Sequence, residues 1–194
     1  MTKTLPTRSS ARTRRAFLRA GLALPALWAS ASALTPTPAH ADPDDATPST
    51  GEGPFFTARS PERTSFRETG LAGTPLEVSG RVLSTDGRPL PRALLDFWHT
   101  DDSGHYDNDG YRFRGHQYTD ADGRYVLRSI VPGAYGGRPK HIHVKLAGGS
   151  RALTTQLLFP EDARGRDWAI DPRLVMAVTD AASGRVARFD FVLG

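Results

Sequence analysis

The sequence predicts an all-β protein, a β-sandwich of about eight strands with few, short helices. Apolar or alternating segments bounded by turn residues recur about every 10–15 residues through residues 51–194, a spacing typical of all-β folds. The chain of 194 residues contains 19 Gly and 15 Pro, a share that favours turns over long helices. Its length suits one domain of ordinary size.

Turn sequences mark out the first strands. Leu76–Ser84 is rich in residues that favour strands, and it ends where residues 85–89 read Thr-Asp-Gly-Arg-Pro. Ala93–Trp98 is largely apolar, which predicts a central strand. Arg124–Ile130 begins after an Asp-Ala-Asp-Gly turn at residues 120–123, and the Pro-Gly pair that follows it ends the strand.

The C-terminal strands follow the same pattern. His141–Leu146 alternates between the two faces, and Leu153–Phe159 is rich in β-branched and apolar residues. Leu174–Thr179 and Val186–Val192 are expected to form a hairpin around an intervening Ala-Ala-Ser-Gly turn. We expect a short helix near Glu161–Trp168.

The first 41 residues differ in charge from the rest of the chain. They contain no acidic residue and six basic ones, Lys3, Arg8, Arg12, Arg14, Arg15 and Arg19. Without these six, the 25 Lys and Arg residues fall to 19 against 21 Asp and Glu, so the remainder has a net charge of −2. A body without a basic surplus argues against nucleic acid as a partner.

This N-terminus has the pattern of an export signal. The basic segment precedes the apolar run Ala20–Leu34, and residues 39–41 read Ala-His-Ala, a small-x-small cleavage site. Residues 13–18, Thr-Arg-Arg-Ala-Phe-Leu, are similar to the twin-arginine signal. The apolar run is short for a membrane span. An ordinary secretory signal and an uncleaved anchor are the alternatives.

Three segments are therefore expected. Residues 1–41 are predicted to be a twin-arginine-type signal peptide, which would place the protein in the periplasm or outside the cell, without stable membrane insertion after processing. Residues 42–50 are acidic and Pro-rich, and are predicted to be a disordered linker. Residues 51–194 are predicted to form the β-sandwich domain.

The strongest chemical signal is a pair of histidines. Because the chain has no cysteine, disulfides, thiolate-bound metals and a catalytic thiol are excluded. Side chains at i and i+2 of a strand share a face, so His141 and His143 can present two imidazoles to one metal ion while Ile142 faces the core. The residues alone leave the other ligands open. Candidates are His105, His116, Asp120 and Asp122, although the two aspartates also suit a turn.

Two tyrosines lie in unusual settings. Tyr106 follows an apolar strand in the sequence Gly-His-Tyr-Asp, and Tyr135 lies in a Gly-rich loop six residues before His141. A large aromatic residue in such a loop often covers a core, so the two tyrosines by themselves do not establish a site.

Seven motifs carry a resemblance to a known family. In chain order they are Glu52–Phe56, Gly104–Tyr106, Phe113–Gly115, Thr119–Tyr125, Val131–Tyr135, Arg138–His143 and Leu153–Leu157. Together they resemble the intradiol ring-cleavage dioxygenases, the group of protocatechuate 3,4-dioxygenase and catechol 1,2-dioxygenase, over residues 51–194. The chain departs from many members between Tyr135 and Arg138, where it has only two glycines and those members carry an insertion.

The resemblance implies a site and a reaction. It implies a prealbumin-like β-sandwich that holds Fe(III) through four metal ligands, Tyr106, Tyr135, His141 and His143. It also implies that a catechol and O2 are converted to a cis,cis-muconate-type product, and it leaves room for a homo-oligomer. Three residues are implied to be catalytic: Tyr135 as the ligand that leaves carrying a proton, and Arg138 and Gln156 as groups beside the substrate ring.

Two other classes of protein remain open at this point. A non-catalytic β-sandwich module of the prealbumin-like or collagen-adhesin type would share the strand pattern of Val78–Tyr125, but it would lack the paired tyrosines and histidines. A cupin-like zinc or Fe(II) enzyme would place a Glu shortly after the histidine pair, and residues 144–149 contain none.

The remaining candidates receive structural interpretations. Trp98 is predicted to be a core residue, and Glu52–Phe56 is predicted to line a pocket or to plug the end of the sandwich. Three histidines are predicted to lie in turns or at the surface, His99, His105 and His116. Two arginines are predicted either to attract an anionic substrate or to form a solvated strand face, Arg112 and Arg114.

Overall fold

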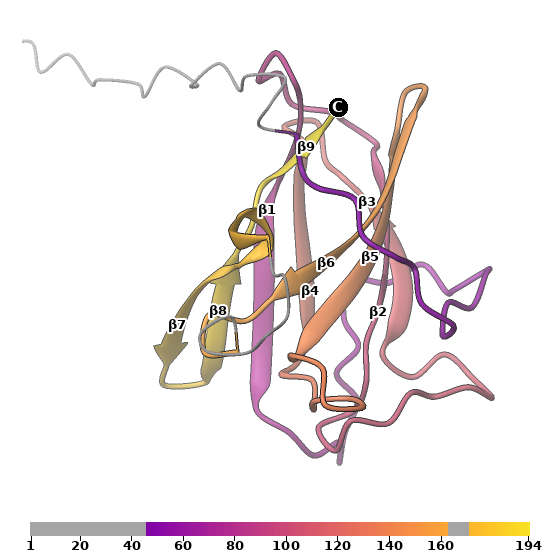
Figure 1. Cartoon of the computed structure of the whole chain (residues 1–194), viewed down its shortest axis with the longest axis vertical. Coiled ribbons are helices and arrows are strands. Elements are labelled where there is room, and N and C mark those ends of the chain that lie inside the picture. The colour runs from indigo at the N-terminus through magenta and orange to yellow at the C-terminus, as the bar shows by residue number, and fades with distance from the viewer. Residues whose placement is uncertain (1–45, 163–170) are drawn as a thin grey trace, which may run out of the picture. The chain divides into compact units, whose positions relative to one another are not determined.

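The structure, a computed structural model, describes residues 46–162 and 171–194. Within them, nine strands form two sheets that pack face to face, so the predicted β-sandwich is confirmed (Figure 1). The strands are β1 (Pro75–Ser84), β2 (Leu94–Trp98), β3 (Arg114–Tyr118), β4 (Arg124–Ile130), β5 (His141–Gly148), β6 (Arg151–Leu158), β7 (Ala177–Ala181), β8 (Gly184–Arg188) and β9 (Phe191–Leu193).

Helical structure is limited to one short turn in the described part of the chain. This turn is η2 (Pro172–Leu174), a 3-10 helix whose N-terminus is capped by the side chain of Asp171. The helix expected near Glu161–Trp168 falls mostly outside the described residues. None of the described helical segments is long and apolar enough to cross a membrane.

The five-stranded sheet is organised around β1. This strand pairs antiparallel with β4 and parallel with β8 and then β9, and β7 lies beyond β8. The expected hairpin is present as β7 and β8, with Ala181 opposite Gly184. The predicted start at Leu174 is wrong, because Pro172–Leu174 forms η2 and β7 begins only at Ala177.

The predicted strand Val186–Val192 is also wrong as a single strand. It is divided into β8 and β9, because Phe189 and Asp190 leave the ladder between them. The Phe189 carbonyl lies so close to Gly80 of β1 that a Cβ on Gly80 would be only 1.8 Å from it. The Asp190 carboxylate accepts the backbone N–H of Arg81 at 2.7 Å and so replaces a strand partner.

The four-stranded sheet has the order β3-β2-β5-β6, and all of its neighbours are antiparallel. Its central strands, β2 and β5, correspond to the predicted segments Ala93–Trp98 and His141–Leu146. The core between the sheets is formed by the inward side chains of both, among them Val78, Leu95, Phe97, Leu127, Ile142, Val144, Leu157 and Phe191. Since Ile142 faces this core, His141 and His143 point to the outer face of the sheet.

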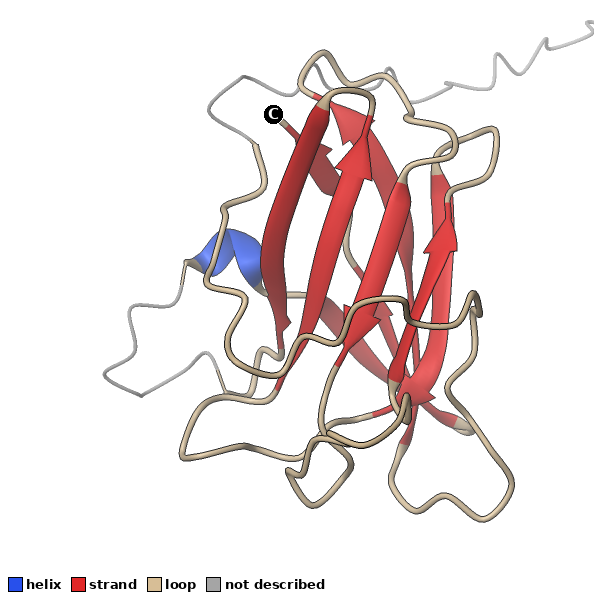
Figure 2. Ribbon diagram, turned by 90° about the vertical axis from the view of Figure 1, so that its right-hand side faces the viewer, coloured by secondary structure: helices blue, strands red, loops and turns tan. Residues whose placement is uncertain are grey.

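That outer face is covered by the N-terminal strap, which we define as residues 46–66 (Figure 2). The strap begins beside β9 and β6, where the N–H groups of Thr47 and Thr50 donate to the carbonyls of Val192 and Thr154, both at 2.9 Å. It ends at β4, where Phe66 N–H donates to Arg128 at 2.8 Å. The disordered linker predicted for residues 42–50 is therefore wrong for residues 46–50, because sheet carbonyls order them; residues 42–45 lie outside the described part.

Candidate metal centre

The two histidines of β5 lie side by side, with their Nε2 atoms 3.1 Å apart. Because Nδ1 of His141 donates to the Pro139 carbonyl at 2.6 Å, its Nε2 is left with a free lone pair. Burial lowers the pKa of His141 and lowers the pKa of His143 to about 2, so both rings are neutral at pH 7. Two nitrogens bound at about 2.1 Å and at right angles would be about 3.0 Å apart, so this pair suits one metal ion.

Tyr106 brings a phenol to the same point. Its hydroxyl lies 3.4 Å from Nε2 of His141, and its ring is stacked under Phe55 of the strap at 4.3 Å between centroids. Burial raises the pKa of Tyr106 to about 12, although Arg138 and Arg114 act in the opposite direction. The phenol is therefore neutral at pH 7 in the metal-free protein, and a bound cation is the group that would ionise it.

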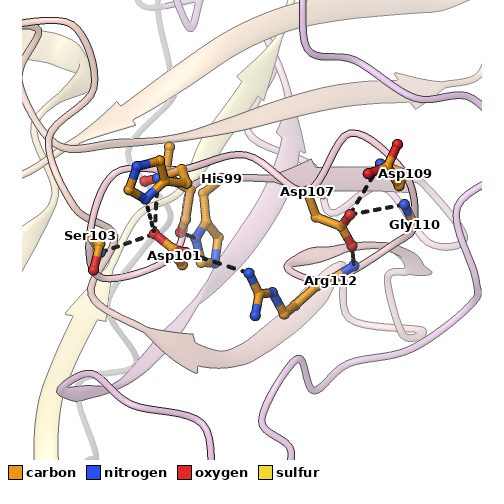
Figure 3. A network of polar contacts seen from close by, with 9 residues as sticks. His99, Asp101, Ser103, Asp107, Asp109, Gly110 and Arg112 are labelled. Carbon is orange, nitrogen blue, oxygen red and sulfur yellow. Dashed lines mark hydrogen bonds and ion pairs between the residues drawn. The ribbon is translucent and has the colours of Figure 1, made fainter.

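The loop that carries Tyr106 is fixed by a carboxylate on its N-terminal side (Figure 3). The side chain of Asp101 accepts the backbone N–H groups of Ser103 at 3.0 Å and of His105 at 2.9 Å. This is the hydrogen-bond pattern of an Asx turn, in which a short acidic side chain replaces a backbone acceptor. The residue directly before Tyr106 is thus tied to the end of β2.

A second carboxylate fixes the other side of Tyr106 (Figure 3). Asp107 accepts three backbone N–H groups, at 3.2, 2.9 and 2.8 Å, from Asp109, Gly110 and Arg112. The Arg112 side chain joins the two turns, since its Nη2 lies 3.5 Å from a carboxylate oxygen of Asp101. The position of Tyr106 is therefore determined by turns on both sides.

Tyr135 lies at the rim of the site. Its ring centroid is 5.6 Å from that of Tyr106 and 5.0 Å from that of Phe55, and both contacts are edge-on. The side chain is 38% exposed, in contrast to the buried histidines. Gly136 and Gly137 follow it at φ values of 54° and 75°, where other residues would be strained. Tyr135 thus lies beside Tyr106 and Phe55 at the exposed rim, in a turn in which its carbonyl accepts the backbone N–H of Arg138 at 2.8 Å.

His143 is enclosed on several sides. The indole of Trp98 stacks on its ring at 4.7 Å and 4°, and Gln156 lies opposite it across β5 and β6. On the strap side, a Cβ on Gly53 would lie 3.7 Å from Cε1 of His143. The Nδ1 atom of His143 is buried and has no hydrogen-bond partner among the described residues. Trp98, which was predicted to be a core residue, is buried, but it packs on His143 and does not belong to the core cluster between the sheets.

A cavity of about 310 Å³ opens beside His141. Its walls come from the strap, the loop before β5, β6 and η2, and include Thr50, Gly51, Pro139, Leu158, Asp171 and Leu174. Arg138 and Gln156 also line it, and Gln156 Nε2 lies 3.4 Å from the carbonyl of Gly51. The volume is at the lower end of the range for small-molecule sites, which suits a ligand the size of a single substituted ring.

Two residues are buried for which a surface position was predicted, in the case of Arg114 as one of two alternatives. His99 is only 1% exposed; its Nδ1 donates to the Thr100 carbonyl at 2.6 Å, and its Nε2 lies 2.7 Å from the Ser129 hydroxyl. Arg114 is also 1% exposed, so its prediction as part of a solvated strand face is wrong. Both errors have one cause, because the strap and the loop after β2 cover positions at which the sequence gives no apolar signal.

The other two histidines lie away from the metal pair. His105 is exposed, as predicted. His116 is half-buried on β3, and its Nδ1 lies 3.1 Å from the hydroxyl of Ser60. The turn aspartates have the structural role that was anticipated, since Asp120 accepts the backbone N–H groups of Asp122 and Arg124 at 2.9 and 2.8 Å.

No group of three or more His, Cys, Asp or Glu side chains gathers anywhere in residues 46–162 and 171–194. A metal site with two histidines and a carboxylate, as the cupin-like alternative needs, is therefore not formed by the described residues. The donors that do converge are two imidazoles and a phenol, with a second phenol at the rim.

Sequence reasoning missed three residues that shape this site. Phe55 contacts both tyrosine rings, although its segment was only expected to line a pocket or plug the sandwich. Asp101 and Asp107 were not singled out at all. For both aspartates the sequence held a signal, because Asp-x-Ser and Asp-Asn-Asp-Gly are typical sequences of turns capped by a carboxylate.

Comparisons with known sequences agree on one family. A family model described as Dioxygenase matches residues 51–194. Catechol 1,2-dioxygenase of Acinetobacter baylyi is 33% identical over 144 residues, which cover 59% of this chain and 46% of that protein. Hydroxyquinol 1,2-dioxygenase of Nocardioides simplex is 40% identical over 143 residues, which cover 61% and 49%. The chain thus spans about half the length of the curated relatives that it matches.

Solved structures give the same result. The dioxygenase domain of a dioxygenase–carbohydrate-binding protein fusion from Streptomyces sp. SirexAA-E is 51% identical, with a TM-score of 0.73, over 76% of this chain and 97% of that one. The 3-chlorocatechol 1,2-dioxygenase of Rhodococcus opacus 1CP is 29% identical, with a TM-score of 0.70, over 76% and 72%.

Proposed function

The chain belongs to the intradiol ring-cleavage dioxygenase family, and on this premise we propose that it uses iron and O2 to cleave the ring of a catechol. The bond broken is the one between the two hydroxylated carbons, and the product is of the cis,cis-muconate type. One observation carries the proposal: two neutral imidazoles and a phenol converge to within 3.4 Å at the edge of a cavity that also holds Arg138 and Gln156.

We propose Fe(III) as the metal, held by Tyr106, Tyr135, His141 and His143. The donor set fits, because it combines imidazole nitrogens with phenol oxygens and contains no thiol. The Nε2 atoms of His141 and His143 lie 3.1 Å apart, which fits two imidazoles that bind one ion through these nitrogens. When bound, ferric iron supplies the Lewis acid that ionises phenols and makes a chelated catechol electron-rich.

The two tyrosines have different parts in the proposed reaction. Tyr106 is held between the turns of Asp101 and Asp107, and it is stacked under Phe55, so it stays in place. Tyr135 is exposed and precedes two glycines, so its phenolate oxygen can accept a proton from a catechol hydroxyl and move away. Tyr135 would thus be the phenol that makes way for the substrate, and Tyr106 the one that stays.

Arg138 and Gln156 line the proposed substrate cavity beside the histidines. The Arg138 guanidinium would stabilise negative charge on the substrate ring, because a cation placed beside charge that develops in the reaction lowers its energy. Gln156 is positioned by its register opposite His143, and its amide would orient the ring by hydrogen bonding.

The proposed activity is tested with purified, iron-loaded protein. Catechol, hydroxyquinol and protocatechuate should each be assayed for O2 uptake and for the product, because the cavity alone does not select among them. We expect a visible tyrosinate-to-iron absorption band, with O2 uptake matching the amount of product. Colourless iron-loaded protein that consumes no O2 with any catechol would overturn the proposal and favour a non-catalytic β-sandwich module.

We also propose that residues 1–41, which lie outside the described part of the chain, form a cleaved twin-arginine signal. The sequence pattern supports this proposal: a basic segment with two adjacent arginines, an apolar run and a small-x-small site. Export would place the dioxygenase domain, residues 51–194, in the periplasm or outside the cell.

A further inference from the structure

Arg114, the first residue of β3, is buried in an unusual way. The side chain is 1% exposed, and its guanidinium forms no ion pair with any described residue. Burying a cation without a carboxylate partner costs free energy, so such a residue is seldom found without a role. The proposed reaction gives Arg114 no role.

The Arg114 guanidinium contacts two backbone carbonyls from different segments. Its Nε donates to the carbonyl of Asp107 at 2.9 Å, and its Nη1 donates to the carbonyl of Phe55. Its Cζ lies 5.9 Å from the centroid of the Tyr106 ring. The first carbonyl belongs to the residue directly after Tyr106, and the second belongs to the residue whose ring stacks on Tyr106.

The position of Arg114 is itself fixed. Its own carbonyl accepts two hydrogen bonds from Arg63 of the strap, from Nε at 3.0 Å and from Nη2 at 2.8 Å. Phe113 before it has a φ of 54°, a conformation that costs free energy for a bulky residue and sets the direction in which β3 begins. Across the sheet, Arg114 lies opposite Trp98, and Trp98 lies opposite His143 and stacks on its ring.

We propose that Arg114 is a positioning residue, which ties the strap to the ligand loop and so presses Phe55 against Tyr106 before metal or substrate binds. Its importance for catalysis rests on the proposed function, but the link itself is a property of the metal-free protein. A guanidinium suits this role because its planar fork offers separate donors to two carbonyls, whereas an ammonium on a shorter chain does not reach both.

Three variants test the proposal. Arg114→Met removes the charge and all donors but keeps much of the volume, and Arg114→Lys keeps the charge but loses the fork. Arg81→Met is the matched control, because Arg81 is an exposed strand arginine whose side chain forms no hydrogen bond or ion pair with described residues. For each variant we would measure the near-ultraviolet circular dichroism of the metal-free protein, its iron affinity, and the visible band at full iron loading.

We expect both Arg114 variants to lose near-ultraviolet signal from the stacked Phe55 and Tyr106 while far-ultraviolet signal is kept. Their iron affinity should fall by about 10–100-fold, the usual effect of removing a residue that orients a metal ligand. Their visible band should shift, and Arg81→Met should match the wild type in all three measurements.

The proposal is overturned if either folded Arg114 variant matches Arg81→Met in near-ultraviolet signal, iron affinity and visible band. If Arg114→Met does not fold, Arg114→Lys decides by the same criteria. A wild type that binds iron but does not cleave catechols would refute the proposed function alone, because the aromatic packing of the metal-free variants is measured without iron or substrate.

Discussion

Replacing Asp107 with Ala should destabilise the protein by removing the acceptor that closes the turn after Tyr106. One carboxylate oxygen accepts the N–H groups of Asp109 and Gly110, and the other accepts that of Arg112. A hydrogen bond contributes about 0.5–1.5 kcal/mol, and because water reaches this loop we use the lower half of that range. Three such bonds give a loss of about 2 kcal/mol in the free energy of unfolding.

A second substitution at position 107 should give an intermediate loss in the free energy of unfolding. Asp107→Asn keeps one oxygen for the N–H groups of Asp109 and Gly110, but it places an amide donor against the N–H of Arg112. Its loss should therefore be about 1 kcal/mol, roughly half that of Asp107→Ala. Asp109→Ala is the control, because the Asp109 carboxylate makes no hydrogen bond or ion pair with described residues.

The assay is urea unfolding of the metal-free protein, followed by iron titration of the same samples. We expect the order of stability to be wild type and Asp109→Ala, then Asp107→Asn, then Asp107→Ala. Iron affinity should follow the same order, since the loop that weakens carries Tyr106. Equal unfolding free energies for Asp107→Ala and Asp109→Ala would show that the carboxylate does not hold the loop.

Three further predictions concern other parts of the molecule. Tyr106→Phe and Tyr135→Phe should each weaken or shift the visible band of the iron-loaded protein. Only Tyr135→Phe should slow substrate deprotonation, which is measured by anaerobic stopped-flow mixing with a catechol. An unchanged visible spectrum in both variants would show that the tyrosines do not bind the iron. Burial lowers the pKa of His99 to about 4, so the unfolded chain binds a proton there at a higher pH than the folded protein does. The stabilisation that neutral His99 contributes is therefore complete above the unfolded pKa of about 6.5 and decreases as the pH falls towards 4. In His99→Gln the free energy of unfolding should depend less steeply on pH over that interval. An unchanged pH dependence would contradict this prediction. Replacing Arg14 and Arg15 together with Lys should leave the precursor in the cytoplasm, and normal export of that variant would rule out the twin-arginine pathway.

The strands that sequence analysis predicted are those whose apolar pattern is visible. Leu76–Ser84 and Arg124–Ile130 match β1 and β4 within one residue at each end, because alternation and turn residues agree there. The strand β3 was not predicted, since Arg-Gly-His-Gln-Tyr has no apolar alternation and owes its pairing to β2 and its burial to the strap. Tertiary contacts far along the chain determine such a strand, and a single sequence does not reveal them.

The same distinction applies to the site. That His141 and His143 share a face follows from strand geometry, and the structure agrees. That Tyr106 and Tyr135 approach this face came only from the family resemblance, because loops of this length have no periodicity from which to infer their path. Arg114 and His99 show the limit of inference from residue type. Their charge and polarity favoured an exposed position, but the strap and the loop after β2 bury both side chains.

The strap explains why an outer sheet face can hold this chemistry. The face opposite the core of a two-layer sandwich is normally wet, and there a histidine would bind protons near neutral pH and a tyrosine would keep its usual pKa. Here the segment from Thr47 to Phe66 forms a partial third layer, and burial under it keeps the imidazoles of His141 and His143 free of protons. The same burial raises the pKa of Tyr106 from about 10 to about 12, which adds to the work that a bound cation does in ionising this phenol. The sheet therefore determines which side chains are neighbours, and burial under the strap determines whether the two imidazoles are protonated when a metal binds.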